Sequence, residues 1–114
     1  MTTVEHVRTL ALGLPRSYEV LVHDRLKFRV GRLVYLAFSR DETKLGFAFP
    51  KEERDALVAA DPTRFSLPAP SDLRFNWAVL RVGAVDDDEV RELVVDAWRM
   101  VVPKRLARDH LGGD

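Results

Sequence analysis

A period of two in the apolar side chains between residues 17 and 49 constrains the fold of this chain more than any other feature. A period of two places the apolar side chains of a strand on one face of a sheet. Four such runs follow one another: Tyr18, Val20 and Val22; Leu26, Phe28 and Val30; Val34, Leu36 and Phe38; Leu45, Phe47 and Phe49. The short polar or glycine-bearing segments between them are typical of hairpin turns. The sequence therefore predicts a meander of four antiparallel strands.

A fifth strand is predicted after an irregular crossing. Residues 65–72 contain Pro68 and Pro70, which interrupt regular structure. Four apolar residues then alternate: Leu73, Phe75, Trp77 and Val79. We expect them to form the aromatic-rich core face of the fifth strand. Within the meander, residues 33–38 are apolar on both faces, so this strand should be central and the one before it half exposed.

Three segments have the period of an amphipathic helix. Thr2 and Glu5 have the spacing of a capping box, and the helix that they begin should end before Pro15. A second helix is expected over residues 51–60, packing through Ala56, Leu57 and Ala60. The third, over residues 86–101, has a continuous apolar stripe: Val90, Leu93, Val94, Ala97, Trp98 and Val101.

These elements predict a single domain, residues 1–114, of the α+β class. We expect two layers, with an antiparallel five-stranded sheet packed by an N-terminal and a C-terminal helix. A chain of 114 residues, 46% of them hydrophobic, is long enough for one core. Only residues 112–114 are expected to fray. The absence of cysteine excludes disulfides, thiolate metal sites and a thiol nucleophile.

The total charge of the chain is balanced. Eighteen basic and 18 acidic residues give a formal net charge of zero, so no overall field attracts phosphate or anionic lipid. No segment approaches the ~20 apolar residues that span a bilayer, and the N-terminus has no basic region followed by an apolar stretch. We expect a soluble cytoplasmic protein that does not associate with membranes.

The sequence contains no pattern that is typical of catalysis or metal binding. His6, His23 and His110 lack the spacing of paired metal ligands. The run 86–89 is acidic but lacks the alternating ligands and the central glycine of a calcium loop, and helix capping accounts for it. No nucleophile elbow, phosphate-binding loop or dinucleotide fingerprint occurs. We predict no catalytic residue, no metal site and no cofactor.

The charges are unevenly distributed along the chain. Residues 24–44 contain six basic and three acidic side chains, whereas residues 86–96 contain six acidic and one basic. Lys27 and Arg29 alternate with apolar residues, so they should leave the sheet on the face opposite the core. Arg32, in the following turn, would extend the same stripe. We call Lys27, Arg29 and Arg32 the basic ribbon and predict that it binds nucleic acid.

A second basic group lies near the C-terminus: Arg99, Lys104, Arg105 and Arg108. Of these, Lys104 and Arg105 are predicted to be auxiliary phosphate contacts, although cations also suit the end of a helix. The alternative for both groups is a solvated face and an edge that resists aggregation, since lysine and arginine on exposed strands prevent pairing between strand edges. Aromatic side chains can stack on nucleic-acid bases, but the positions of Tyr35 and Trp77 favour the core.

Five segments of the chain together resemble one family of proteins. They are Leu14-Pro15, Phe28-Arg29-Val30-Gly31, Pro68-Ala69-Pro70, Asn76-Trp77 and Val101-Val102-Pro103-Lys104. In this combination the chain resembles the MmcQ/YjbR family of small bacterial proteins. The resemblance implies a compact α+β fold, described as CyaY-like or double-wing-like, and a DNA-binding role. It implies neither catalytic residues nor a cofactor. The chain departs from the common family pattern at Asp24, where a glycine often follows the histidine.

We therefore predict a non-enzymatic protein whose partner is DNA. The ribbon residues Lys27, Arg29 and Arg32 would contact phosphates, which position a protein on DNA without reading its sequence. Two alternatives stay open. One is a module that holds a protein partner through an exposed strand edge or through residues 65–70. The other is a small-molecule sensor or minor enzyme with a pocket between sheet and helix.

Overall fold

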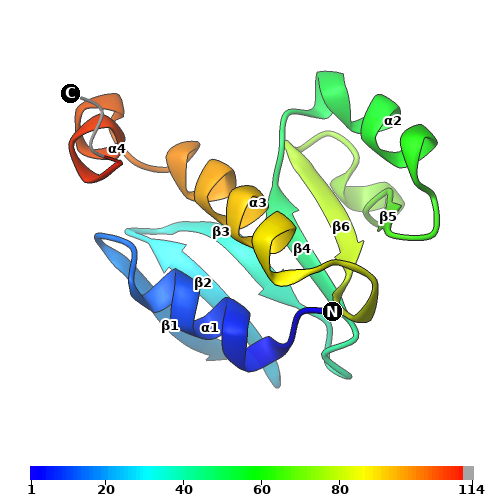
Figure 1. The fold of residues 1–114 in the computed structure, drawn as a ribbon, viewed down its shortest axis with the longest axis horizontal. Helices are drawn as coiled ribbons and strands as arrows, with labels where there is room; N and C mark the ends of the chain where they lie inside the picture. The colour runs from blue at the N-terminus through cyan, green and yellow to red at the C-terminus, as the bar shows by residue number, and fades with distance from the viewer. Residues whose placement is uncertain (112–114) are drawn as a thin grey trace.

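The predicted meander is present in the structure (Figure 1). The computed structural model describes residues 1–111, so the fraying predicted for residues 112–114 lies outside the described part. Four consecutive strands pair antiparallel in chain order: β1 (Ser17–Val22), β2 (Arg25–Val30), β3 (Leu33–Phe38) and β4 (Lys44–Ala48). The first turn has positive φ at both His23 and Asp24, the geometry of a two-residue type I′ hairpin. Asp24 thus takes a left-handed conformation that glycine adopts more easily.

The sheet has six strands, so the prediction of five was wrong. Beyond β4 lie β6 (Trp77–Arg81) and, at the edge, β5 (Phe65–Ser66), giving the order β1-β2-β3-β4-β6-β5. The strand β5 is only two residues long. It lies within residues 65–72, which the sequence predicts to be irregular because of Pro68 and Pro70. So short a strand leaves no period in the sequence. The predicted fold class, an α+β domain with an antiparallel sheet, is confirmed.

The predicted orientation of the fifth strand was also wrong. The strand β6 begins at Trp77, and its core-facing residues are Ala78 and Leu80, which are fully buried. Leu73 and Phe75 lie in the preceding loop and are exposed. The alternation from Leu73 to Val79 therefore runs across a loop and a strand, and its strand members face away from the core. Trp77 accordingly lies on the other face of the sheet.

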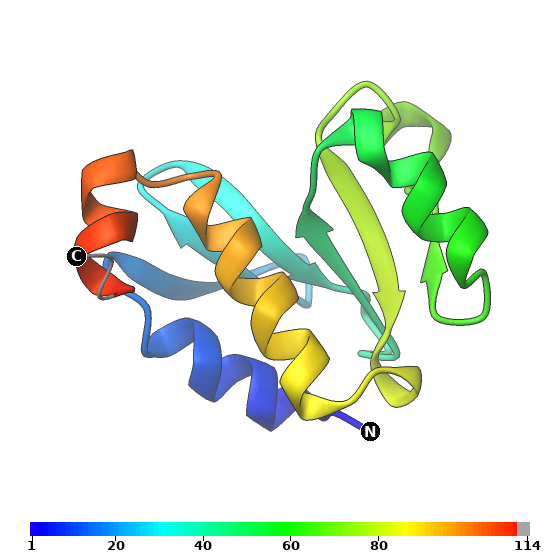
Figure 2. The same cartoon turned by 45° about the horizontal axis from the view of Figure 1, so that its top comes forward.

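The helices α1 (Val4–Leu12) and α3 (Asp87–Arg99) lie side by side on one face of the sheet (Figure 2). Asp86 caps α3 as expected, because its carboxylate accepts the Glu89 backbone N–H. The cap of α1 is Thr3, one residue after the predicted Thr2, and its hydroxyl accepts the backbone N–H of His6. The two helices and the sheet enclose the core.

Large aromatic side chains fill the space between sheet and helices. Trp98, Tyr35 and Phe28 are completely buried, and the Trp98 indole donates to the carbonyl of Pro15 at 2.9 Å. Tyr35 is the extra residue of a β-bulge, since Val34 pairs with Arg29 and Leu36 pairs with Phe28. Its hydroxyl lies 2.6 Å from Ser17 Oγ. Burial raises the pKa of Tyr35 to about 12, so its hydroxyl stays protonated at neutral pH.

Two further α-helices and two short 3₁₀ helices, η1 (Pro70–Asp72) and η2 (Val82–Ala84), complete the described part. The helix α2 (Lys51–Ala60) has the predicted bounds and packs through Leu57 as predicted, but Ala56 and Ala60 are exposed, and the partly buried Val58 and the buried Arg54 pack in their place. The helix α4 (Lys104–His110) was not predicted as a separate element. The helix α3 ends at Arg99, and Pro103 is the N-cap of α4, which lies beyond the end of α3 (Figure 1).

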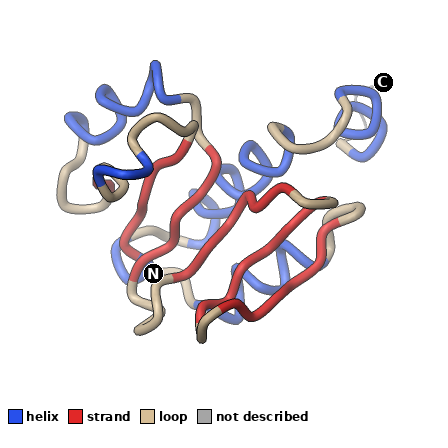
Figure 3. Tube along the Cα trace, turned by 180° about the vertical axis from the view of Figure 1, so that it is seen from behind, coloured by secondary structure: helices blue, strands red, loops and turns tan. Residues whose placement is uncertain are grey.

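One face of the meander stays uncovered by the described helices. Figure 3 views the molecule from behind and shows the strands in front, with α1 and α3 behind them. We call this the open face of the sheet. The strand β3 is interior and largely buried, and β2 is half exposed, as predicted.

Candidate nucleic-acid interface

The cationic side chains of β2 lie together on the open face. Phe28 and Val30 face the core and are buried. Arg25, Lys27 and Arg29 alternate with them and therefore point the other way. Their neighbours across the strands are uncharged: Val22, Val20 and Tyr18 on β1, and Ala37 and Val34 on β3. The structure thus places two residues of the predicted ribbon on one surface and adds Arg25 to them.

These cations are not neutralised within the described part of the chain. The ion pairs among residues 1–111 involve His6, Arg8, Arg64 and Arg99 on the basic side, none of which belongs to the ribbon. The Arg29 side chain makes no hydrogen bond there, and its Nε is buried without a partner. Arg25 donates its Nε to the Phe38 carbonyl at 3.1 Å, and Arg32 is exposed at the turn. The cationic groups of these side chains that reach the surface are available to an anionic ligand.

Two further cations on the open face were not singled out by sequence reasoning. Lys44 of β4 and Arg81 of β6 lie directly opposite each other, and both are exposed. They alternate with Leu45 and Leu80, which face the core. Lys44 could have been found from the period of two in its strand. Arg81 could not, because the prediction assigned the residues of β6 to the wrong faces of the sheet.

The structure does not bring Lys104 and Arg105 into the ribbon. Both residues are exposed in the first turn of α4, and Lys104 lines a different surface pocket with Arg99 and Arg108. The expectation that the basic group suits the end of a helix holds for Arg99 and Arg108, which lie in the last turns of α3 and α4, but was wrong for Lys104 and Arg105, because they begin α4. The dipole of a helix disfavours cations at that position.

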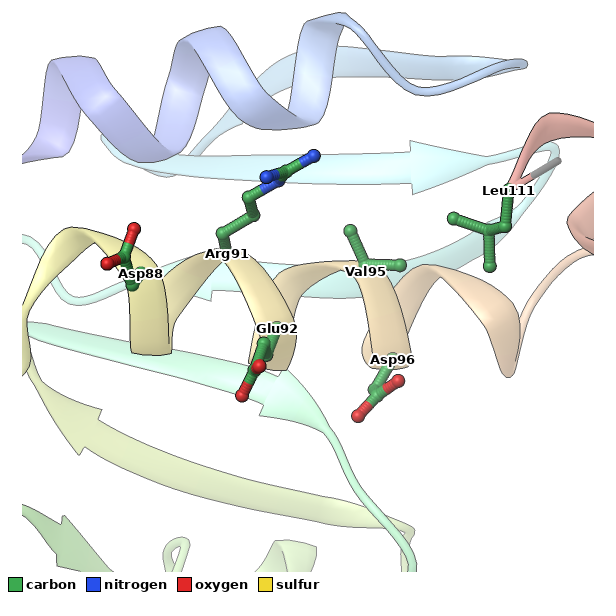
Figure 4. A pocket seen from close by; sticks show the side chains of 6 residues that line it. All are labelled: Asp88, Arg91, Glu92, Val95, Asp96 and Leu111. Atoms are coloured by element: carbon green, nitrogen blue, oxygen red, sulfur yellow. The ribbon is translucent and has the colours of Figure 1, made fainter.

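Acidic side chains gather on α3, on the helical layer of the molecule. A shallow groove of about 650 Å³ there is lined by Asp88, Arg91, Glu92, Val95, Asp96 and Leu111. Figure 4 shows Asp88, Glu92 and Asp96 spaced along the helix. The uneven charge along the sequence therefore becomes a separation in space, with cations on the open face and acids on the helical layer.

Asp41, an acidic residue near the basic strands, stabilises the turn between β3 and β4. Asp41 lies between β3 and β4 and accepts hydrogen bonds from Ser39 Oγ at 2.7 Å and from Thr43 Oγ1 at 2.8 Å. These donors, together with the Thr43 backbone N–H, lower the pKa of Asp41 to about 2. The carboxylate is thus an acceptor that shapes the turn.

Aromatic side chains form one wall of a pocket beside the ribbon. The pocket has a volume of about 190 Å³ and is lined by Arg25, Lys27, Val34, Ala37, Asp72, Phe75 and Trp77. Trp77 is half-buried, and Phe75 is 50% exposed. Trp77, which was predicted to belong to the core, is partly buried and packs against its margin, whereas Tyr35 is a fully buried core residue as predicted. Sequence reasoning missed Phe75 and Asp72 as members of this surface.

Trp77 rests on a strand position that has no side chain. A Cβ atom built on Gly46 would lie 2.5 Å from Trp77 Nε1 and 2.8 Å from two carbons of the indole. We expect Gly46→Ala to destabilise the protein by about 1–3 kcal/mol, because the ring must move off the sheet. Urea unfolding would measure this loss.

The matched control for that substitution is Gly13→Ala. A Cβ on Gly13 would meet its nearest atoms at an ordinary 3.5 Å, and the backbone φ of Gly13 is negative. We expect this variant to unfold at the same or a higher urea concentration. A Gly46→Ala protein as stable as Gly13→Ala would contradict the packing of Trp77 on the strand.

The loop that carries Phe75 is held by a buried cation. Arg54 of α2 is 7% exposed, and its guanidinium donates to three backbone carbonyls of the loop and strand start. The acceptors are Leu73 at 2.9 Å, Phe75 at 3.1 Å and Trp77 at 3.0 Å. The aromatic wall is therefore fixed from behind by one side chain.

The three histidines lie in separate parts of the structure. His23 is exposed in the first turn, His6 lies 3.8 Å from Asp87, and His110 packs edge-on against Trp98. Residues 1–111 contain no group of three side chains placed to hold a metal ion. No helix in the same range is both long and apolar enough to cross a bilayer.

In the segment proposed for a protein partner, residues 65–70, two of the six residues are buried and the other four are exposed. Phe65 is buried and pairs in β5, and Pro68 is buried. Leu67 is the exposed large apolar side chain between them. A partner that contacts this stretch would therefore have to use Leu67 rather than Phe65.

Comparisons with known proteins show which chains this one is similar to. A family model described as YjbR matches residues 12–100. The crystal structure of Deinococcus radiodurans protein DR2400, described with the family-model domain DUF419, is similar in fold, with a TM-score of 0.77 and 24% sequence identity. The similarity covers 98% of this chain and 89% of that chain. No curated protein matched the sequence. The matched range contains the ribbon and the aromatic pocket, whereas α4 lies outside it.

Proposed function

This chain belongs to the YjbR family, and we propose that it is a non-enzymatic protein that binds DNA through the open face of its sheet. Arg25, Lys27, Arg29 and Arg32 would contact phosphate oxygens. Phosphate contacts of this kind fix the position of a protein on DNA without reading the base sequence. Lys104 and Arg105, on α4, are auxiliary in this proposal.

The observation that carries the proposal is the set of cations along β2 that form no ion pair with a carboxylate of the described residues. Alternate side chains on a strand are about 6.6 Å apart, a spacing comparable to that between consecutive phosphates of one nucleic-acid strand. Arginine also presents a planar fork of donors that matches a phosphate group. Since no carboxylate of the described residues pairs with these cations, their charge is free to act on a ligand.

One half of the alternative explanation of the ribbon, the protection of a sheet edge, does not fit its position. Lysine and arginine protect the edge of a sheet when they lie on an edge strand. The strand β2 lies between β1 and β3, so it is not an edge. The other half, a solvated face without a ligand, predicts that DNA does not bind, and a titration with DNA distinguishes it from the proposal. The acids on α3 would favour the orientation in which the open face meets the phosphates.

A titration at several salt concentrations tests this proposal. We expect labelled duplex DNA to bind with an affinity that falls with salt, with a slope of log affinity against log salt near −3.6 for four phosphate contacts. For a single strand the same four contacts correspond to a slope near −2.8. Fluorescence anisotropy measures both. Binding that is absent, or that does not change with salt, would refute the proposal.

A further inference from the structure

The pocket beside the ribbon combines an apolar floor, an aromatic wall and a cationic rim. Val34 and Ala37 of β3 line it together with Trp77 and Phe75, and Lys27 lies at the same pocket. We propose that this pocket takes one unpaired base, so that the protein prefers single-stranded DNA to duplex. The inference rests on the proposed function, because the ribbon would hold the phosphates of the strand whose base enters.

The size of the pocket favours a single planar group. Its volume of about 190 Å³ lies below the ~300–1,000 Å³ of typical pockets for larger ligands. Aromatic side chains with an accessible face bind bases by stacking, which tolerates any base because every base has a π face. Trp77 and Phe75 line this pocket, and in the proposal the ring faces that are not packed on Gly46 or covered by Arg74 receive the base.

The aromatic wall is prepared before a ligand arrives. Arg54 fixes the carbonyls of Phe75 and Trp77, and Gly46 lets the Trp77 indole lie close to the strand. The guanidinium of Arg74 lies 4.8 Å from the centre of the Phe75 ring. A base that stacks there would not first have to order the loop, and ordering costs reduce affinity.

Asp72 determines which part of a nucleotide can enter the pocket. It is the acidic residue that lines the pocket, where it faces a rim of cations. A carboxylate repels a phosphate but accepts N–H groups of a base, as acidic side chains do with cytosine. Guanine presents two adjacent N–H donors to the two oxygens of a carboxylate, whereas thymine presents one donor between two carbonyls. We therefore expect guanine to be preferred to thymine.

Three 12-nucleotide ligands with equal phosphates per strand separate base binding from phosphate binding. They are a thymidine strand with one central guanine, its duplex, and the same strand with abasic sites in place of all bases. We expect the single strand to bind about 5- to 150-fold more tightly than the abasic strand, the range given by stacking of one base. Anisotropy at fixed salt measures all three.

Two variants remove the wall of the pocket. Phe75→Ala and Trp77→Ala should each lower affinity for the single strand toward that of the abasic strand and leave the abasic strand unaffected. Because Trp77 also packs on Gly46, its removal can unfold the sheet, and the exposed Phe75 then carries the test. Trp77→Phe keeps an aromatic face and should retain more affinity than Trp77→Ala.

The control is Leu12→Ala, since Leu12 is similarly exposed, at 47%, but lies on α1 on the opposite side of the sheet. It should bind all three ligands like the unaltered protein. Equal affinity for the single, duplex and abasic ligands would overturn the inference while leaving phosphate binding intact. Failure to bind any of them would instead refute the proposed function itself.

Discussion

Replacing Lys27, Arg29 and Arg32 together with glutamine is expected to lower the affinity for duplex DNA about 500-fold at 0.1 M salt. Each phosphate contact contributes a slope of about −0.9, which corresponds to roughly eightfold in affinity between 0.1 M and 1 M salt. The eightfold factors of three lost contacts multiply to about 500-fold, the expected loss of affinity. The salt slope should fall from about −3.6 to about −0.9, and the variant should approach the unaltered protein in affinity near 1 M salt.

This variant should fold normally, because the three side chains lie outside the core. Lys27 and Arg29 project from the open face, and Arg32 is exposed at a turn. Glutamine keeps the first methylene groups of each side chain and its ability to donate hydrogen bonds. Thermal unfolding monitored by circular dichroism should therefore give a melting temperature close to that of the unaltered protein.

A second triple variant controls for total charge. Lys104→Gln, Arg105→Gln and Arg108→Gln remove the same three charges from α4, which lies away from the ribbon. We expect a much smaller loss of affinity. The slope of log affinity against log salt should change by less than about 1.8, the value for two phosphate contacts. Equal losses in the two triple variants would show that binding depends on net charge alone, and the assignment of phosphates to β2 would be wrong.

The ribbon could be predicted because its signal is local. The apolar residues around Lys27 and Arg29 alternate without interruption, so the face of each side chain follows from the period of a strand. The same rule failed for Trp77. Its alternation with Leu73 and Phe75 is equally regular, but the strand begins only at Trp77 and pairs so that Ala78 and Leu80 face the core. A period cannot indicate which of its residues are in the strand.

The pocket could not be predicted because the residues that line it are far apart in the sequence. Lys27 and Trp77 are 50 positions apart in the sequence and meet only through the order of strands in the sheet. The role of Arg54 has the same origin, since its acceptors lie 19 to 23 residues away. In the sequence Arg54 is one of several charged residues of a short helix. Its spacing from Leu57 and Val58 places it on the packed face of the helix, but nothing local indicates that three carbonyls lie there to accept its hydrogen bonds.

Replacing Arg54 with methionine is expected to destabilise the protein by about 3 kcal/mol. The guanidinium satisfies three carbonyls, and each hydrogen bond to a charged donor contributes about 1.5–3 kcal/mol. Two of the acceptors lie in the exposed loop, at Leu73 and Phe75, where water can replace the lost donor. The net cost is therefore nearer to that of one or two such bonds than of three. Urea unfolding should show it as a lower midpoint with an unchanged m-value.

Lys51→Met is the matched control on the same helix. Lys51 Nζ also donates to the loop, at the Arg74 carbonyl 3.3 Å away, but Lys51 is exposed, so its loss should cost no more than about 0.5 kcal/mol. Arg54→Met should also reduce the preference for single-stranded DNA, because the wall that carries Phe75 loses its anchor. Duplex binding, which depends on β2, should persist. If Arg54→Met were as stable as Lys51→Met, the loop would be held by other contacts, and the prepared wall of the pocket would need another source.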